Sequence, residues 1–480
     1  MIRPIRVVAA LLGIAMIALI INASYLQVVA AGDLRERPGN RRVIVSEYDK
    51  QRGPILVGST AIASSVELGE DLRFQRVYEH GEMYAPVTGF MSMVYGSTGL
   101  ERAENQVLSG SSPLLLGDRI EQLFAGKRPV GGAVTTTIDA RAQQAAYQAL
   151  GNKIGSVVAI EPATGRILAL VQSPSFDPNE LASHQASEVL AYHEALKSDP
   201  SKPLLNRPIV SLNPPGSTFK LVTAAAALAS GDYRPDSVLP GPRTYRLPGT
   251  NTDLRNWNDR ACGPNDEVTL QRALEMSCNT AFAWLGVQLG AEALRTQAQA
   301  FGFDTGFEIP LRAATSRFPD DPDIPQTALA AIGQFDVRAT ALQMAMVAAG
   351  IANGGQVMEP TLVREIRSPS LTVLEAPVPV PFATALSAQH AQELTTMMEG
   401  VVRQGTGGNA AISGIPVAGK SGTAQTSPDR PSIAWFVAFA PADRPSIAVA
   451  VAVEDAATSE ISGNGLAAPI ARSVIDAVLP

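Results

Sequence analysis

Histidine and cysteine are scarce in this sequence, and their scarcity limits the chemistry open to the chain. The 480 residues include 4 histidines and 2 cysteines. No Cys/His cluster with metal-binding spacing is evident, and there is no Walker loop or dinucleotide fingerprint. We therefore expect no metal and no cofactor. The histidines lie in no Gly-x-Ser-x-Gly or triad-like context, so we expect surface or structural roles for His80, His184, His193 and His390.

Charge is also sparse. Charged residues make up 17% of the chain, and the formal net charge is −7. An acidic balance gives no reason to expect nucleic acid as a partner. Hydrophobic residues make up 46% of the chain, which at this length is consistent with a folded protein of roughly two to four domains.

A long hydrophobic stretch opens the sequence. Arg3 and Arg6 precede an uncharged run over residues 7–31, in which polar residues begin only at Asn22. This pattern predicts a membrane anchor with its basic end in the cytoplasm and the bulk of the chain outside it. A cleaved signal peptide is the alternative, because residues 29–31 resemble a cleavage site. We favour the uncleaved anchor, and hence a single-pass protein of the cell membrane.

A four-residue motif at 217–220, Ser-Thr-Phe-Lys, carries the first chemical signal. It follows a Pro-Pro-Gly turn and precedes an alanine-rich helical run, which places Ser217 near a helix N-terminus. Lys220 lies about one helical turn on, where its amine can accept the serine proton if burial lowers its pKa. Ser-x-x-Lys also arises by chance, and a helix-capping serine followed by a solvated lysine is the simpler interpretation of the motif alone.

Two further motifs follow in order along the chain. Ser-Cys-Asn at 277–279 comes after a helical pattern at 270–276, and Lys-Ser-Gly-Thr at 420–423 precedes a strand-like run at 433–439. Ser-x-x-Lys, Ser-x-Asn and Lys-Ser-Gly-Thr in this order form the motif set of penicillin-binding proteins and serine β-lactamases. The chain therefore resembles that superfamily.

The resemblance implies a role for each motif residue. Ser217 would be the nucleophile and Lys220 its general base. Ser277 would relay the proton towards the leaving amine, while Asn279 would hydrogen-bond the peptide amide of the substrate. Lys420 would keep the site positive for an anionic substrate.

The third motif would bind the far end of the substrate. Ser421 and Thr423 would supply hydroxyl groups for its terminal carboxylate. Gly422 would let the strand backbone approach the ligand, so that the N–H groups of Thr423 and Ser217 form an oxyanion hole.

The flanking sequence narrows the resemblance to class B penicillin-binding proteins, the monofunctional transpeptidases, over nearly the whole chain. Within that family the chain is most similar to the actinobacterial penicillin-binding protein A type. After a strand-like run at 41–45, residues 52–55 resemble the N-terminal pedestal motif and residues 99–101 its downstream Gly-x-Glu region. Further matches to habitual phrases of the family lie at 173–179, 206–207, 333–334 and 434–436.

The resemblance implies three parts and an α/β fold. Residues 1–32 would be a cytoplasmic stub and transmembrane anchor, and 33–150 a small β-rich pedestal of the dimerisation type. Residues 151–480 would be the transpeptidase domain, an antiparallel sheet flanked by helices plus a helical lobe. Two strand-like runs at 155–161 and 165–171 predict a β-hairpin that opens this domain.

The implied function is that of a peptidoglycan D,D-transpeptidase of cell-wall synthesis, linked to cell division. Ser217 would attack the D-Ala–D-Ala bond of a stem peptide, release D-alanine and pass the acyl group to an amine of a neighbouring stem. β-Lactam antibiotics would acylate the same serine. The region before the catalytic part is too short for a polymerase domain, so the expected partners are a separate SEDS-family glycan polymerase and division proteins.

Three alternatives use the same motifs: a D,D-carboxypeptidase, a serine β-lactamase, and a β-lactam sensor or division scaffold. A class A β-lactamase needs a base for the deacylating water, yet no glutamate between Ser277 and Lys420 has Asn at the third position after it. A sensor would need a cytoplasmic signalling segment, and the six residues before the hydrophobic stretch are too few to form one.

The two cysteines, Cys262 and Cys278, are sixteen positions apart in the sequence. We predict a disulfide between them, since both lie outside the cytoplasm in the favoured topology and Cys278 belongs to the second motif. Closing that loop would stabilise the fold by about 3 kcal/mol and brace the loop that carries Ser277 and Asn279. The alternative is two separate thiols, with Cys278 a small buried side chain.

Overall fold

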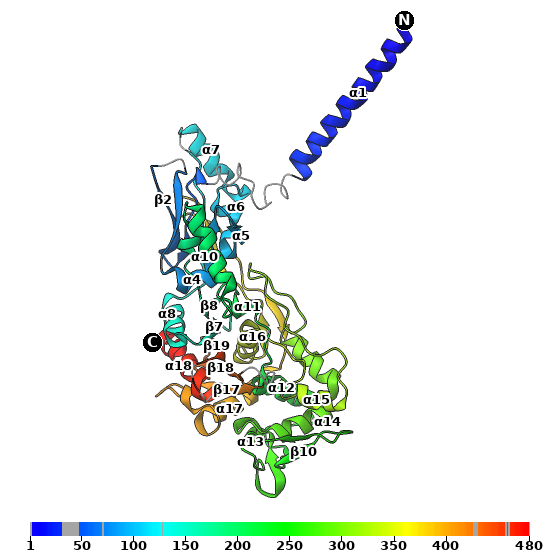
Figure 1. The fold of residues 1–480 in the computed structure, drawn as a ribbon. Helices are drawn as coiled ribbons and strands as arrows, with labels where there is room; N and C mark the ends of the chain where they lie inside the picture. The colour runs from blue at the N-terminus through cyan, green and yellow to red at the C-terminus, as the bar shows by residue number, and fades with distance from the viewer. Residues whose placement is uncertain are drawn as a thin grey trace.

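The structure is a computed structural model of the chain, and it describes residues 2–30, 48–69, 72–126, 128–425, 431–456, 458 and 461–479. Figure 1 shows three parts in succession: a long N-terminal helix, a β-rich pedestal and a larger α/β body that ends the chain. The strand-like run expected at 41–45 lies outside the described residues.

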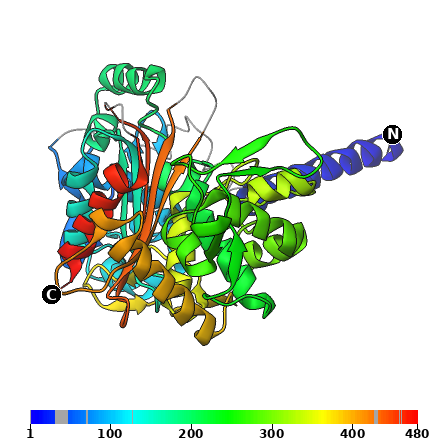
Figure 2. The same cartoon turned by 90° about the horizontal axis from the view of Figure 1, so that it is seen from below.

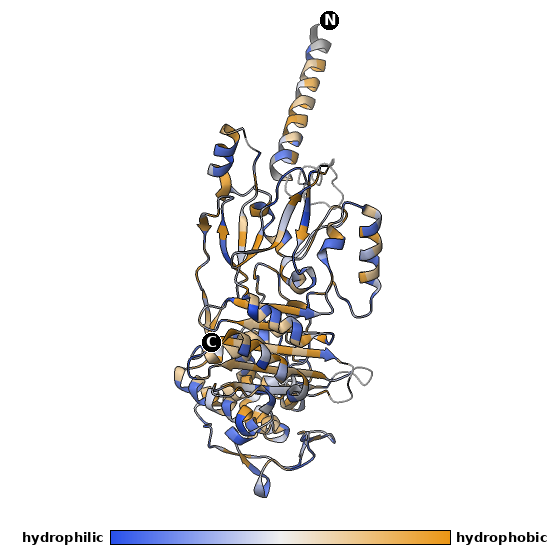
Figure 3. Ribbon diagram, turned by 90° about the vertical axis from the view of Figure 1, so that its left-hand side faces the viewer, coloured by the Kyte–Doolittle hydropathy of each residue, from blue (hydrophilic) through white to orange (hydrophobic). Residues whose placement is uncertain are grey.

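The N-terminal helix α1, Ile2–Ser24, continues into a π-helical turn, Tyr25–Val29. Its span Arg6–Gln27 is 22 residues long, and none of its apolar window is buried. In Figure 3 the helix is hydrophobic along most of its length and stands clear of the rest of the chain. Among the described residues it is the one helix long and apolar enough to cross a membrane.

A six-stranded sheet forms the pedestal, in the order β15-β14-β6-β1-β2-β3. The strands are β1 Ile55–Val57, β2 Thr60–Glu67, β3 Phe74–Tyr78, β6 Ala133–Thr136, β14 Val363–Arg367 and β15 Val373–Glu375. β1 and β6 are parallel, and the other neighbours are antiparallel. Two of the six strands, β14 and β15, lie more than two hundred positions further along the chain than the other four.

Short helices and a β-ribbon complete the pedestal and its junction with the body. They are α4 Gly81–Thr88, β4 Met91–Ser92, β5 Gly96–Ser97, α5 Gly99–Ala103, α6 Asn105–Leu108, α7 Leu116–Phe124, α9 Pro178–Ala182, α10 Ala186–Ser198 and α11 Arg207–Val210. A small apolar cluster joins the two parts, because Ala85 and Phe90 of the pedestal pack with Phe176, Leu181 and Val189.

The body is built on a five-stranded antiparallel sheet, in the order β17-β18-β19-β7-β8. Its strands are β7 Ile154–Ile160, β8 Ile167–Ser173, β17 Ala418–Ala424, β18 Ile433–Ala440 and β19 Ile447–Asp455. All eight residues of β18 are buried, as expected of a strand covered on both faces. Figure 2 shows this sheet between a helical layer on each side. The expected hairpin, β7 with β8, and the expected α/β fold are both confirmed.

Helix α8, Ala140–Leu150, belongs to the body rather than to the pedestal. Asp139 caps its first turn by accepting hydrogen bonds from the N–H groups of Arg141 and Ala142. Its inner side chains pack in one core with β7, β18 and β19 and with the last helix, α18 Ala468–Val478. Helix α8 thus packs with the body, and β14 and β15 pair within the pedestal sheet.

A helical lobe covers the opposite face of the sheet. Its elements are α12 Lys220–Ser230, α13 Leu270–Glu275, α14 Asn279–Ala300, α15 Ile324–Ala330, α16 Ala341–Ala352 and α17 Ala388–Gln404, with the short strands β9 Val238–Pro240, β10 Thr244–Arg246, β11 Asp253–Arg255, β12 Glu267–Thr269, β13 Gln356–Met358 and β16 Pro381–Thr384. Small residues let these helices approach closely. A methyl group on Gly286 of α14, for example, would lie 2.2 Å from Cβ of Ala331.

A buried ion cluster holds the pedestal together. Glu101 is fully buried and accepts hydrogen bonds of 2.6 Å from Nε of both Arg52 and Arg76. Burial alone would raise the pKa of Glu101, but the two guanidinium groups outweigh it and lower the pKa. Gly53 and Gly99 bring the backbones around the cluster close together, since a Cβ at either would meet backbone atoms within 2.4 Å. Both segments that resemble family motifs in the pedestal thus contribute to one ion cluster.

Glu101→Gln should destabilise the pedestal strongly, because it leaves two buried cations without their carboxylate. We expect the local free energy of opening of β1–β3 to fall by about 3–5 kcal/mol. Amide hydrogen exchange of those strands measures it. Glu67→Gln is the matched control: it breaks the exposed Arg73–Glu67 pair and should cost less than about 1 kcal/mol. Equal protection in both variants would contradict the role of Glu101.

Candidate active site

Ser217 lies in a 3₁₀ turn, Gly216–Phe219, that leads directly into α12. Two glycines allow the turn to dock on the body. The N–H of Gly216 donates to the carbonyl of Gly333 over 2.9 Å, and a Cβ on Gly333 would lie 2.1 Å from the Gly216 oxygen. Ser217 remains partly exposed, whereas Phe219 and Lys220 are fully buried. Ser217 therefore lies near the surface at the head of α12, and the side chain of Lys220 lies inside.

The buried Lys220 amine bonds to the second motif. Its Nζ lies 2.8 Å from the carbonyl oxygen of Ser277, 2.8 Å from Oδ1 of Asn279 and 3.4 Å from Oγ of Ser277. All three acceptors are neutral, so no carboxylate holds the proton on the amine. Burial first, and the nearby Lys420 second, lower the pKa of Lys220 well below its usual value. A neutral amine at this position can act as a base.

Ser277 owes its position to the way α13 ends. The N–H of Cys278 bonds to the carbonyl of Ala273 and the N–H of Ser277 to that of Leu274, which is the hydrogen-bond pattern of a Schellman motif. Ser277 occupies its left-handed position with φ of 60°, where glycine is the usual residue. The turn it makes presents the carbonyl and hydroxyl of Ser277 to the two lysines.

Lys420 approaches the same hydroxyl from the sheet. It lies on β17, is fully buried, and donates to Oγ of Ser277 over 3.0 Å and to the carbonyl of Ser421 over 2.7 Å. Burial lowers the pKa of Lys420 to about 7. Because two ammonium groups beside one hydroxyl repel each other, the pair favours a state with fewer than two charges near neutral pH.

The edge of the sheet runs beside the nucleophile turn. β17 is the edge strand, and Gly422 lets it approach, since a Cβ there would lie 3.0 Å from the Thr218 side chain. Trp435 of β18 fastens the turn from the other side by donating to the carbonyl of Pro214 over 3.0 Å. An edge strand has backbone groups free to pair with an extended peptide, which would then lie next to Ser217.

The hydroxyl groups of the third motif are held by neighbouring loops. Ser421 Oγ donates to Oγ1 of Thr406 over 2.7 Å, and the N–H of Gly463 points at Oγ1 of Thr423 from 3.4 Å. Thr423 is exposed beside the strand edge. Thr406 gave no signal in the sequence, because its contact with Ser421 joins parts of the chain through the fold alone.

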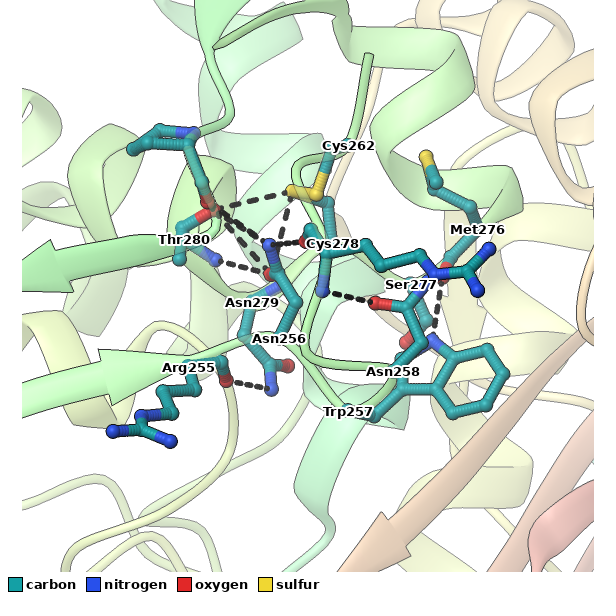
Figure 4. The surroundings of a disulfide bond; sticks show 12 residues. Arg255, Asn256, Trp257, Asn258, Cys262, Met276, Ser277, Cys278, Asn279 and Thr280 are labelled. Carbon is teal, nitrogen blue, oxygen red and sulfur yellow. Dashed lines mark hydrogen bonds between the residues drawn. A yellow bond between two sulfur atoms is a disulfide. The ribbon is translucent and has the colours of Figure 1, made fainter.

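A disulfide and an asparagine position the start of α14 (Figure 4). Cys262 and Cys278 are bonded, with their Cα atoms 6.0 Å apart. Oδ1 of Asn256 accepts from the N–H groups of Asn279 and Thr280 over 2.9 and 3.1 Å. It thereby caps a helix whose own capping residue, Cys278, makes no side-chain cap. Asn256 gave no signal in the sequence, because it precedes the helix that it caps by 23 positions.

The structure thus brings most of the expected site residues together. Lys220, Ser277, Asn279 and Lys420 form one hydrogen-bonded group, and Gly422 lies against the turn of Ser217. The bonds of the Lys220 amine go to the second motif rather than to Ser217. Among the described residues, no group of three or more His, Cys, Asp and Glu could hold a metal ion.

Two protein-family models match the chain, and known proteins are similar to it over nearly its whole length. Residues 155–476 match the penicillin-binding protein transpeptidase domain, and residues 52–134 match the penicillin-binding protein A dimerisation domain. The chain is 45% identical to the peptidoglycan D,D-transpeptidase PbpA of Mycolicibacterium smegmatis over 99% of its own length and 98% of that protein. It is equally identical to PbpA of Mycobacterium tuberculosis, over 96% of both chains.

Solved structures of penicillin-binding protein A are also similar to this chain. Penicillin-binding protein A of M. tuberculosis, as its ceftriaxone acyl-enzyme, matches with a TM-score of 0.87 and 45% identity over 91% of this chain and 100% of that one. Its penicillin G acyl-enzyme matches with a TM-score of 0.86 and 44% identity, covering 90% and 100%. The expected family is confirmed: the chain belongs to the class B penicillin-binding protein transpeptidases.

Proposed function

We propose that the chain is a peptidoglycan D,D-transpeptidase of cell-wall synthesis and that Ser217 is its nucleophile. The observation that carries this proposal is a buried lysine with neutral partners, Lys220, one helical turn after a partly exposed serine. The relatives support the reaction class, since two are named peptidoglycan D,D-transpeptidases and the M. tuberculosis protein forms acyl-enzymes with β-lactams.

The first half-reaction uses the hydrogen-bonded group of lysines and Ser277. Ser217 Oγ attacks the carbonyl carbon of the D-Ala–D-Ala bond while its proton passes to the neutral Lys220 amine. The N–H groups of Ser217 and Thr423 stabilise the oxyanion. When the tetrahedral intermediate collapses, the C–N bond breaks, and a proton relayed through Ser277 converts the departing nitrogen to the amine of free D-alanine. The acyl group stays on Ser217 as an ester.

The second half-reaction reverses these proton movements. An amine of a neighbouring stem peptide attacks the ester and loses a proton to the same relay, and Ser217 Oγ leaves with a proton from Lys220. Asn279 holds the peptide amide, while Ser421, Thr423 and the charge of Lys420 hold the terminal carboxylate in the first step. A β-lactam enters the first half-reaction in place of the stem peptide, and its ring-opened product stays bonded to the serine.

We further propose that α1 spans the cell membrane with Arg3 and Arg6 on the cytoplasmic side, so that the pedestal and body lie outside the cell. The length and apolar surface of α1 support this, and a disulfide suits an oxidising compartment. As partners we propose a SEDS-family glycan polymerase, which supplies the glycan strands, and proteins of cell division.

Removing the nucleophile should abolish covalent labelling. Ser217→Ala is expected to reduce labelling by a fluorescent penicillin to background, as judged on denaturing gels. Ser230→Ala is the matched control: it changes an exposed serine at the end of α12, the helix that follows the turn of Ser217, and should label like the parent. Label on the Ser217 variant would refute the assignment, and rapid loss of label from the parent would indicate hydrolysis in place of transfer.

The acylation rate should depend on pH through both lysines. The rate should fall at low pH, where Lys220 becomes protonated and cannot accept the serine proton. It should fall again on the alkaline side as Lys420, whose pKa burial lowers to about 7, loses its charge. Stopped-flow measurement with a chromogenic cephalosporin gives the profile.

A Lys220→Arg variant tests which limb belongs to the base. Arginine keeps its charge across the range, so the rate should fall by about 10²–10⁴ and the acidic limb should vanish. A parent rate that rises only towards pH 10.5, the ordinary value for lysine, would contradict the assignment of Lys220 as the base.

A further inference from the structure

Helix α7 exposes its apolar face to its surroundings. Leu116, Ile120, Leu123 and Phe124 recur at helical spacing and share one side of the helix. All four are exposed, Leu123 by 65% and Phe124 by 90%. None of the residues of α7 is buried in the protein. An ordinary surface helix of a globular protein turns such a stripe towards the core.

The side of α7 that lies nearer the protein is polar instead. Asp118, Arg119 and Gln122 are its partly buried residues, and Oε1 of Gln122 accepts a hydrogen bond of 3.0 Å from the N–H of Val130. The helix is thus attached through its polar side, and the orientation of the apolar side is fixed outward. An exposed apolar stripe on a helix is unfavourable in water. We therefore expect an apolar surface outside the described residues to cover Leu116, Ile120, Leu123 and Phe124.

The place of α7 in the fold identifies what lies opposite it. The chain enters the pedestal from the anchor just before Asp49, whose carboxylate accepts from Arg128 over 3.0 Å. Two residues further along the chain, the carbonyl of Gln51 accepts a hydrogen bond from the N–H of Gly131. The entry from α1 therefore lies beside the segment that follows α7. The 17 residues between Ala30 and Tyr48 span at most about 60 Å.

Another exposed apolar side chain, Leu371, lies at the same end of the pedestal. β14 pairs with β6 so that Arg367 lies opposite Ala133, which places the following turn, with Leu371 52% exposed, at the end of the sheet near α7. Figures 1 and 3 show α7 on the side of the pedestal towards α1, and Figure 1 shows α12 and β17 of the candidate active site within the body, away from α7.

We propose that α7 lies on the outer surface of the membrane that α1 crosses, with Leu116, Ile120, Leu123 and Phe124 inserted at the boundary between headgroups and acyl chains. This rests on the proposed anchor. The charged residues of α7 are Asp118, Arg119 and Glu121, which together are not basic, so the helix binds by apolar insertion rather than by attraction to anionic lipids. Four apolar side chains would bind a bilayer weakly alone, but tethering through α1 keeps the helix at the surface.

Contact between α7 and lipid can be measured in the full-length protein by the quenching of a fluorophore attached to the helix. Both native cysteines are in the disulfide, so Phe124→Cys provides a single reactive thiol for an environment-sensitive fluorophore. The labelled chain is reconstituted into phosphatidylcholine vesicles with or without doxyl-labelled lipid. Ile120→Cys is a second probe on the apolar side, and Glu121→Cys, which is exposed on the same helix but off that side, is the matched control.

We expect doxyl lipid to quench the probes at 120 and 124 severalfold more than the probe at 121, with blue-shifted emission at both. Equal quenching at all three positions would overturn the proposal. Protection from aqueous iodide without lipid quenching would overturn it in favour of a protein partner, including a second copy of the chain. Vesicle flotation checks the anchor separately, and a chain that fails to float overturns the anchor and this proposal together. Labelling of Ser217 by fluorescent penicillin verifies the fold of each variant.

Discussion

The mechanism proposed for this protein depends on two lysine amines that share one serine hydroxyl inside the fold. Lys220 and Lys420 are fully buried, and both contact Oγ of Ser277. In water each amine would be protonated at neutral pH. Removing them from water without carboxylate partners makes the neutral form accessible, as their lowered pKa values indicate. The site can therefore combine a base with a residual positive charge, which are the two properties that acyl transfer from an anionic peptide requires.

Such an arrangement is unfavourable unless the surroundings hold it in place. Ser277 adopts a left-handed backbone conformation, which costs about 1–2 kcal/mol for a residue with a Cβ. The structure offsets this strain with interactions that converge on one short turn: the Schellman hydrogen bonds at the end of α13, the Asn256 cap on α14 and the disulfide through Cys278. The second motif is thus positioned by residues outside the three motifs.

Local features of the sequence were enough to predict the local elements. The hairpin of β7 with β8, the helix after Ser217 and the strand that follows the third motif all follow from periodicity and turn residues. Contacts between distant segments could not be predicted in this way. Nothing in residues 363–367 indicates that they pair with β6, and nothing near Asn256 indicates a helix 23 positions later. Both result from tertiary packing, which a single sequence does not encode in its local pattern.

The exchange of elements between pedestal and body has a mechanical consequence. β6 of the pedestal leads directly into α8 of the body, and β14 returns from the body to pair with β6. The chain crosses back to the body after β15, so at least three covalent crossings connect the two parts. The N–H of Thr137 donates to the carbonyl of Leu362, and the N–H of Ile167 donates to that of Thr361, so a hinge motion at the first two crossings would have to break these hydrogen bonds. The ion cluster at Glu101 stiffens the same sheet from within. These connections favour motion of pedestal and body as one unit, so the membrane contact proposed for α7 would also constrain the position of Ser217 in the body.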